Sequence, residues 1–96
     1  MAFIQVIEMR TSKFDEINAL DKEWEKATEG KRTLRRSLTC QDRNDPNRYV
    51  ILAFFDSYES AMENSNLPET GEFAQRQSKL ADSTTFTDLD VLEERS

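Results

Sequence analysis

The side chains of this sequence that are best suited to hold a ligand are polar or aromatic residues within apolar patterns. Gln5 lies in an otherwise apolar N-terminal run, and Trp24 lies on the apolar stripe of a helix-like segment. A buried amide needs hydrogen-bond partners, and an indole combines a flat apolar surface with one N–H donor. Gln5 is therefore either a ligand-binding residue or a partner in a subunit interface. Trp24 is either a pocket residue or part of the core.

Three further side chains offer charge or stacking. Arg35 projects from the predicted strand face that also carries Ser37 and Thr39, where its guanidinium would bind a carboxylate ligand or form an ion pair across an interface. Tyr49 and Phe55 begin and end an apolar run, so they would stack on a planar ligand or fill the core of a dimer. These alternatives stay open at the level of sequence.

The usual acid–base groups of enzymes are scarce. The sequence has no histidine and a single cysteine, Cys40. Histidine is the side chain that titrates near neutral pH and the commonest transition-metal ligand, so we expect no metal site. A cysteine without histidine lacks the usual base for nucleophilic catalysis, and we expect Cys40 to be a small buried hydrophobe. A general base would be a perturbed carboxylate or the substrate itself, and the catalytic residues remain unknown.

Length and composition predict one soluble domain over residues 1–96. The sequence is 36% hydrophobic and 33% charged, which is too apolar for a disordered chain and too polar for a membrane protein. Its net charge of −6 argues against a nucleic-acid partner, because an acidic domain repels phosphate backbones. The N-terminus lacks the features of a signal peptide, and no stretch is long enough to span a bilayer, so we expect a cytoplasmic protein.

The hydrophobic periodicity predicts alternating strands and helices. Ser12 is the expected N-cap of a helix beginning near Lys13, Ser57 that of a short helix, and Pro68 suits the first turn of another. The dense turn-forming run 42–47 joins two strands as a hairpin. The predicted strands are residues 2–10, 33–41, 48–56 and 84–93. The order β-α-β-β-α-β predicts a ferredoxin-like α+β sandwich with one four-stranded antiparallel sheet and helices on one face.

The two most apolar strands predict a homodimer. Residues 2–10 and 48–56 are apolar on both faces, whereas helices can cover only one face of a sheet. An apolar sheet face of that size does not stay in water, and a second copy related by C₂ symmetry is the expected cover. We expect the open face to carry Phe3, Ile7, Met9, Tyr49, Ile51 and Phe55.

The strand–helix–hairpin pattern, together with the segment Tyr49-Val-Ile-Leu-Ala-Phe-Phe-Asp-Ser-Tyr-Glu-Ser-Ala-Met, resembles the dimeric α+β barrel proteins. The nearest group is the antibiotic biosynthesis monooxygenase-like family. That family often carries an aromatic–acid–Ser–x–Glu–Ala stretch, which is similar to residues 55–61 here. The resemblance implies two ferredoxin-like sheets packed face to face, with a pocket between the sheet and a helix in each subunit.

The sequence departs from that family at functional positions. Phe55 stands where the family often has Trp, and Asn64 stands where it often has His. Asn64 is therefore either a residue at the pocket entrance, by resemblance, or a helix cap. Haem-degrading relatives use a His that would fall near Gln77, so no haem and no other cofactor is expected. The preferred hypothesis is a protein that binds a small aromatic or polyketide-like molecule without catalysis, or an accessory protein. The alternative is a cofactor-independent monooxygenase.

Overall fold

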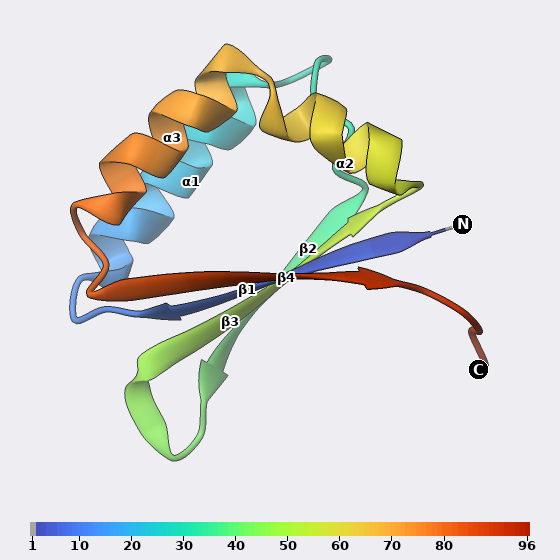
Figure 1. The fold of residues 1–96 in the computed structure, drawn as a ribbon. Helices are drawn as coiled ribbons and strands as arrows, with labels where there is room; N and C mark the ends of the chain where they lie inside the picture. Colours follow the sequence, from blue (N-terminus) through green and yellow to red (C-terminus); the bar gives the residue numbers. More distant parts are fainter. Residues whose placement is uncertain (1) are drawn as a thin grey trace.

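A computed structural model describes residues 2–96 as a single four-stranded sheet with helices on one side (Figure 1). The strands are β1 (Phe3–Arg10), β2 (Arg36–Asp42), β3 (Asp45–Phe55) and β4 (Ser83–Asp90). The helices are α1 (Phe14–Ala27), α2 (Tyr58–Ser65) and α3 (Pro68–Ser78). The strand order is β2-β3-β1-β4, and every neighbouring pair is antiparallel. The predicted fold class is confirmed, with the second helical region divided into α2 and α3.

The start of α1 differs from the prediction. Ser12 does not cap the helix; the N-cap position is Lys13, which makes no side-chain cap hydrogen bond. The buried Thr11 instead organises this corner, since its hydroxyl accepts a hydrogen bond from the Lys13 N–H (2.9 Å) and donates one to the Leu80 carbonyl (2.8 Å). Thr11 thereby ties the entry of α1 to the segment that follows α3.

The predicted start signals of α2 and α3 are confirmed. Ser57 accepts a hydrogen bond from the backbone N–H of Ser60, and the Ser60 hydroxyl accepts one from the Ser57 N–H, which completes a capping box. Pro68 occupies the first turn of α3, where its missing N–H leaves no hydrogen bond unmade. Asn66, not Asn64, is the C-cap of α2.

The hairpin between β2 and β3 is tighter than predicted. Asp42 pairs with Asp45, so only residues 43–44 form the turn, and the sheet continues into the turn-forming run. A register shift lies between Gln41 and Asp42. Pro46 is tolerated in β3 because it lies beyond the residues that pair with β1 and opposite this irregularity.

The helices cover the opposite sheet face from the one predicted. Phe3, Ile7, Met9, Tyr49, Ile51 and Phe55 were expected on the open face, but they lie on the face toward the helices. Met9 and Phe3 are 1% and 2% exposed, and the buried core cluster joins Phe3 and Phe55 to Ala61 of α2. The prediction was wrong because both faces of β1 and β3 are apolar, so alternation alone does not identify the covered face.

The open face carries the alternate residues and is also apolar. It consists of the even-numbered side chains of β1, β2 and β3 and the odd-numbered side chains of β4, among them Ile4, Val6, Leu38, Val50, Leu52, Phe54 and Leu89. Leu38 and Leu89 are 44% and 45% exposed in the single chain. Cys40 shares this face and is exposed, so the expectation of a buried cysteine is wrong for the protomer.

Candidate functional site

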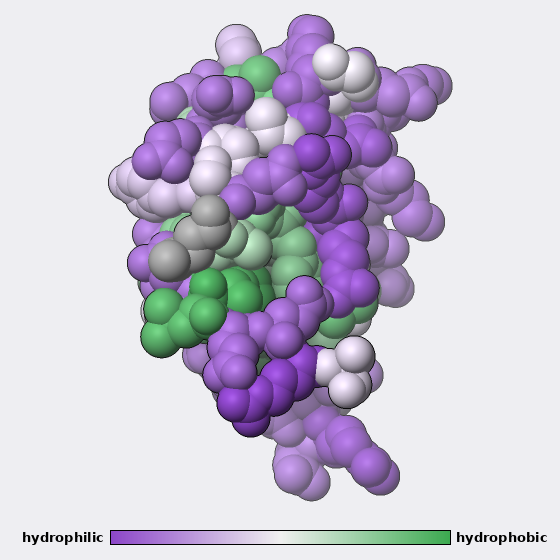
Figure 2. Space-filling model, turned by 90° about the vertical axis from the view of Figure 1, so that its right-hand side faces the viewer, coloured by the Kyte–Doolittle hydropathy of each residue, from purple (hydrophilic) through white to green (hydrophobic). Residues whose placement is uncertain are grey.

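A cavity of about 290 Å³ lies between the sheet and the helices. α1 and α3 lie side by side and arch over the sheet (Figure 1), so that they form a roof rather than packing flat on the strands. Figure 2 shows hydrophobic residues in a recess of the molecular surface, bordered by hydrophilic ones. The volume is close to the lower end of the range typical for small-molecule pockets.

The floor and roof of the cavity are mainly apolar. The floor is formed by side chains of β1 and β3 that point toward the helices: Ile7, Met9, Ile51, Ala53 and Phe55. The roof comes from α1 and α3: Phe14, Ile17, Trp24 and Phe73. Phe86 of β4 adds a further aromatic side chain that lines the cavity although it is 60% exposed, which places it at an opening. Such a lining favours a flat apolar molecule.

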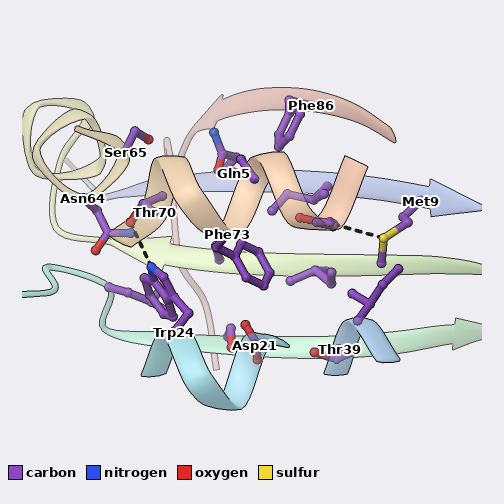
Figure 3. Close-up of a pocket in the computed structure, with 18 of the residues that line it drawn as sticks. Gln5, Met9, Asp21, Trp24, Thr39, Asn64, Ser65, Thr70, Phe73 and Phe86 are labelled. Carbon is purple, nitrogen blue, oxygen red and sulfur yellow. Dashed lines mark hydrogen bonds between the residues drawn. The ribbon is translucent and has the colours of Figure 1, made fainter. Parts of the chain in front are cut away.

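Trp24 is a pocket residue that also holds the roof together. Its indole N–H donates a hydrogen bond to the Thr70 hydroxyl across 2.9 Å, from α1 to α3 (Figure 3). Its ring lies 6.4 Å from that of Phe73, and the Arg32 guanidinium lies 6.0 Å from its centroid. Trp24 therefore lines the cavity and is only partly buried, and its part in ligand binding stays a prediction.

Asn64 lies at the α2 end of the cavity and is 6% exposed. Its side-chain oxygen accepts a hydrogen bond from the backbone N–H of Thr33 (3.1 Å), and the Thr33 hydroxyl donates to the carbonyl of Ser60. The first bond fixes the Asn64 amide relative to the loop before β2, and the second ties the same loop to α2. An amide held in this way presents a preorganised hydrogen-bonding group to the cavity.

Two glutamines line the cavity from opposite layers. Gln5 on β1 lies near Asp88 of β4, with 3.5 Å between its amide nitrogen and a carboxylate oxygen. Gln77 on α3 is buried, and its amide nitrogen lies 3.1 Å from the Met9 sulfur (Figure 3). Sulfur is a weak acceptor, so the Gln77 amide gains little from that contact. In the sequence Gln77 was noted as the position near which a histidine of haem-degrading relatives would fall, and it was not identified as a pocket residue.

Arg35 and Tyr49 do not line the cavity. The Arg35 guanidinium makes hydrogen bonds of 2.9 and 2.5 Å to the Asp56 carboxylate at the surface of the protomer. This contact raises the pKa of Arg35 and lowers that of Asp56. Tyr49 stacks on Phe14, with ring centroids 4.3 Å apart, and so supports the cavity from behind one of its walls. Of the six predicted site residues, the cavity brings together Gln5, Trp24, Phe55 and Asn64.

Asp21 is a pocket residue that sequence reasoning missed. It lies on α1 among the cavity-lining residues, and Figure 3 shows it between Trp24 and Thr39 in that view. Burial is the main cause that raises its pKa above the ordinary value; Glu25 raises it further, and Arg32 opposes the shift. The available signal was its spacing, since position 21 falls four residues after Ile17 and three before Trp24, on the apolar stripe.

Residues 2–96 offer neither a metal centre nor a membrane-spanning helix. No group of three or more His, Cys, Asp or Glu side chains in this range is arranged to hold a metal ion. None of the described helices is long and apolar enough to cross a membrane.

Comparison with known proteins relates the chain to others through structure alone. No protein-family model and no curated protein matches its sequence. SnoaB, a cofactor-independent oxygenase from Streptomyces nogalater, superposes with a TM-score of 0.82 at 12% identity, over 97% of this chain and 95% of its own. Rv0793 from Mycobacterium tuberculosis gives 0.81 at 14%, over the whole of both chains. A conserved protein from Methanosarcina mazei Go1 gives 0.81 at 16%, over 93% of this chain and 91% of its own.

Several other similar structures carry the name antibiotic biosynthesis monooxygenase, among them one from Chloroflexus aurantiacus with a TM-score of 0.76 at 17% identity, over 100% of this chain and 98% of its own. At such identities the likeness establishes the fold and leaves the activity open. The resemblance noted in the sequence is confirmed at that level: this chain has the ferredoxin-like α+β fold of the antibiotic biosynthesis monooxygenase-like proteins.

Proposed function

We propose that this protein binds a small aromatic or polyketide-like molecule in the cavity beneath α1 and α3. The observation that carries the proposal is the cavity itself, in which aromatic side chains surround a few fixed polar groups. Trp24, Phe55 and Phe73 would stack on or enclose a planar ring system. Asn64 and Gln5 would supply orienting hydrogen bonds. Arg35 is left out of this proposal, because its guanidinium is engaged with Asp56 away from the cavity.

The proposed assembly is a homodimer formed through the open sheet face. Val50, Leu52 and Phe54 lie in the middle of that face, on a strand that no helix covers on this side. The Arg36 guanidinium lies 4.4 Å from the Phe54 ring centroid and frames the patch at one end. A self-complementary apolar face is suited to a C₂ partner. A single cysteine cannot form a disulfide within the chain, so the cytoplasm stays the expected compartment.

Ligand binding is tested with an anthrone as probe. Because Trp24 is the only tryptophan, quenching of its fluorescence reports directly on the cavity, and calorimetry supplies an independent Kd. In Ala74→Phe, a larger side chain at a cavity-lining position of α3 should abolish binding. Gln75→Phe, an exposed neighbour on the same helix that does not line the cavity, is the matched control and should bind normally. Equal binding by Ala74→Phe and the unaltered protein would overturn the proposal.

The second candidate function is a cofactor-independent oxygenase. It is supported by the shared fold with SnoaB, which is an oxygenase of that kind. In such a reaction an anthrone methylene becomes a carbonyl; one atom of O₂ enters the product and the other leaves as water with the two methylene hydrogens. Oxygen uptake above the uncatalysed rate, lost in Ala74→Phe, would support catalysis. Binding without uptake would support a carrier or accessory role.

A further inference from the structure

Among residues 2–96, Asp21 is the only ionisable side chain in the lining of the cavity. The remaining polar lining consists of amides and hydroxyls. Asn18 lies one turn before Asp21 on α1, the exposed Ser37 and Thr39 of β2 also line the cavity, and Thr39 appears beside Asp21 in Figure 3. Asp21 as a whole residue is exposed although neighbouring atoms partly desolvate its carboxyl group, so it stands at an opening rather than in the depth of the pocket. A ligand that enters there meets a negative charge at the rim of an aromatic interior.

The charged neighbours leave Asp21 without a strong partner. Besides burial, the like charge of Glu25 on the same helix raises the pKa of Asp21, and the charge of Arg32 lowers it. The Arg32 guanidinium, however, donates to the Glu25 carbonyl (2.6 Å) and faces the Trp24 ring. In the part of the chain that the structure describes, no Lys or Arg lies within ion-pair distance of Asp21, although seven other ion pairs form.

We propose that Asp21 determines the ligand class of the cavity, as the acceptor for a hydroxyl or ammonium group carried by an otherwise apolar, planar molecule. The inference rests on the proposed ligand-binding function and deepens it. A carboxylate can accept hydrogen bonds but donates none, so it favours ligands with donors. Within the same lining no cationic side chain is present to hold a carboxylate or phosphate. The cavity therefore discriminates against anionic ligands.

A purely structural role for Asp21 makes a different prediction. If Asp21 stabilised the fold, its replacement would lower the stability of the protein. Here burial raises the pKa of Asp21, so the ionised form is less favourable in the folded chain than in the unfolded one. The destabilising effect is absent below the unfolded pKa and fully present above the raised folded pKa. Asp21→Asn should therefore keep or raise the Tm at pH 7 while it changes ligand choice.

The test compares three naphthalene probes: 2-naphthylmethylammonium, 2-naphthol and 2-naphthoate. The unaltered protein should bind the ammonium and the naphthol at least about tenfold more tightly than the carboxylate at pH 7. Asp21→Asn should weaken the binding of the ammonium by about tenfold and strengthen the binding of naphthoate, with a smaller change in the affinity for naphthol. Asp15→Asn removes an exposed carboxylate from the first turn of the same helix and should reproduce the unaltered pattern. Its role is to control for net charge.

Acidification gives an independent readout. As the pH falls through the raised pKa of Asp21, the preference for the ammonium over 2-naphthol, neither of which titrates in this range, should shrink in the unaltered protein and stay flat in Asp21→Asn. Equal binding of all three probes, blocked by Ala74→Phe, would refute the role of Asp21 while leaving the proposed function intact. Binding of none of them would count against both. Identical effects of Asp21→Asn and Asp15→Asn would refute the role of Asp21 as well.

Discussion

The Trp24 indole N–H and the Thr70 hydroxyl lie 2.9 Å apart and join α1 to α3 above the cavity. A second link runs along the same helix pair, where Arg76 contacts Glu23 at 3.0 Å. That pair is exposed on both sides, so it adds little stability. The partly buried Trp24–Thr70 bond is therefore the main polar connection between α1 and α3 in the roof.

Removing the Trp24–Thr70 bond should destabilise the protein and loosen the roof. Thr70→Val keeps the shape of the side chain but removes the acceptor, at an expected cost of about 1 kcal/mol in the free energy of unfolding. Trp24→Phe removes the donor together with part of the ring. Urea unfolding of both single variants and the double variant forms a double-mutant cycle. A coupling energy of about zero would show that the bond contributes nothing.

Ser57 and Ser12 provide a matched test of helix capping. Ser57→Ala should cost about 1 kcal/mol, because it removes one half of the capping box of α2. Ser12→Ala should change the stability by less than about 0.5 kcal/mol, since Ser12 caps no helix. Thermal or urea unfolding measures both. A larger effect at Ser12 than at Ser57 would contradict the assignment of these caps.

The two glycines should respond in opposite directions to replacement by alanine. Gly71 lies inside α3, and an added Cβ would meet no atom within 4 Å, so Gly71→Ala should stabilise by about 0.5–1 kcal/mol. Gly30 has a φ of +79° in the turn after α1, where Gly30→Ala introduces strain and should destabilise. Differential scanning calorimetry should show Tm shifts of opposite sign. Shifts of the same sign would argue against one of these backbone conformations.

The Arg10–Asp45 ion pair should shape the acid side of the stability curve. The Arg10 hydrogen bond, followed by the Asn47 backbone N–H, lowers the pKa of Asp45 below its ordinary value. The contribution is present above the unfolded pKa and is lost as the pH falls through the lower folded pKa. Asp45→Asn should therefore flatten the loss of stability below about pH 4. Asp90→Asn, which removes an exposed carboxylate at the end of β4, should leave that slope unchanged.

The homodimer is tested at the centre of the open face. Leu52→Glu places a charge among apolar neighbours on β3 and should convert a dimer into a monomer in analytical ultracentrifugation at micromolar concentration. Leu92→Glu alters an apolar residue that is 87% exposed after β4 and should not change the mass. A monomer for the unaltered protein would refute the proposed dimer. Cys40 offers a second readout, since a covered thiol should react slowly with a thiol reagent in the dimer alone.

Local signals in the sequence determined much of the fold. The helical spacing of Ile17 and Trp24 located α1, Ser57 located α2, and Pro68 located α3, because capping and periodicity act within one or two turns. The alternation of the first strand likewise indicated that Gln5 is a polar residue in apolar surroundings. These are properties of neighbouring residues along the chain, so no long-range contact was needed to recognise them.

Only the tertiary structure decided which sheet face the helices cover and where the cavity lies. Both faces of β1 and β3 are apolar, so the alternation of Phe3 and Ile4 fits either choice, and the choice depends on where the chain leaves the strand for α1. For the same reason, only the folded structure distinguishes the polar residues that line the cavity from those that lie outside it. Asp21 joined Trp24 and Asn64 at one cavity, whereas Arg35 turned outward to Asp56, because these contacts join segments far apart in sequence.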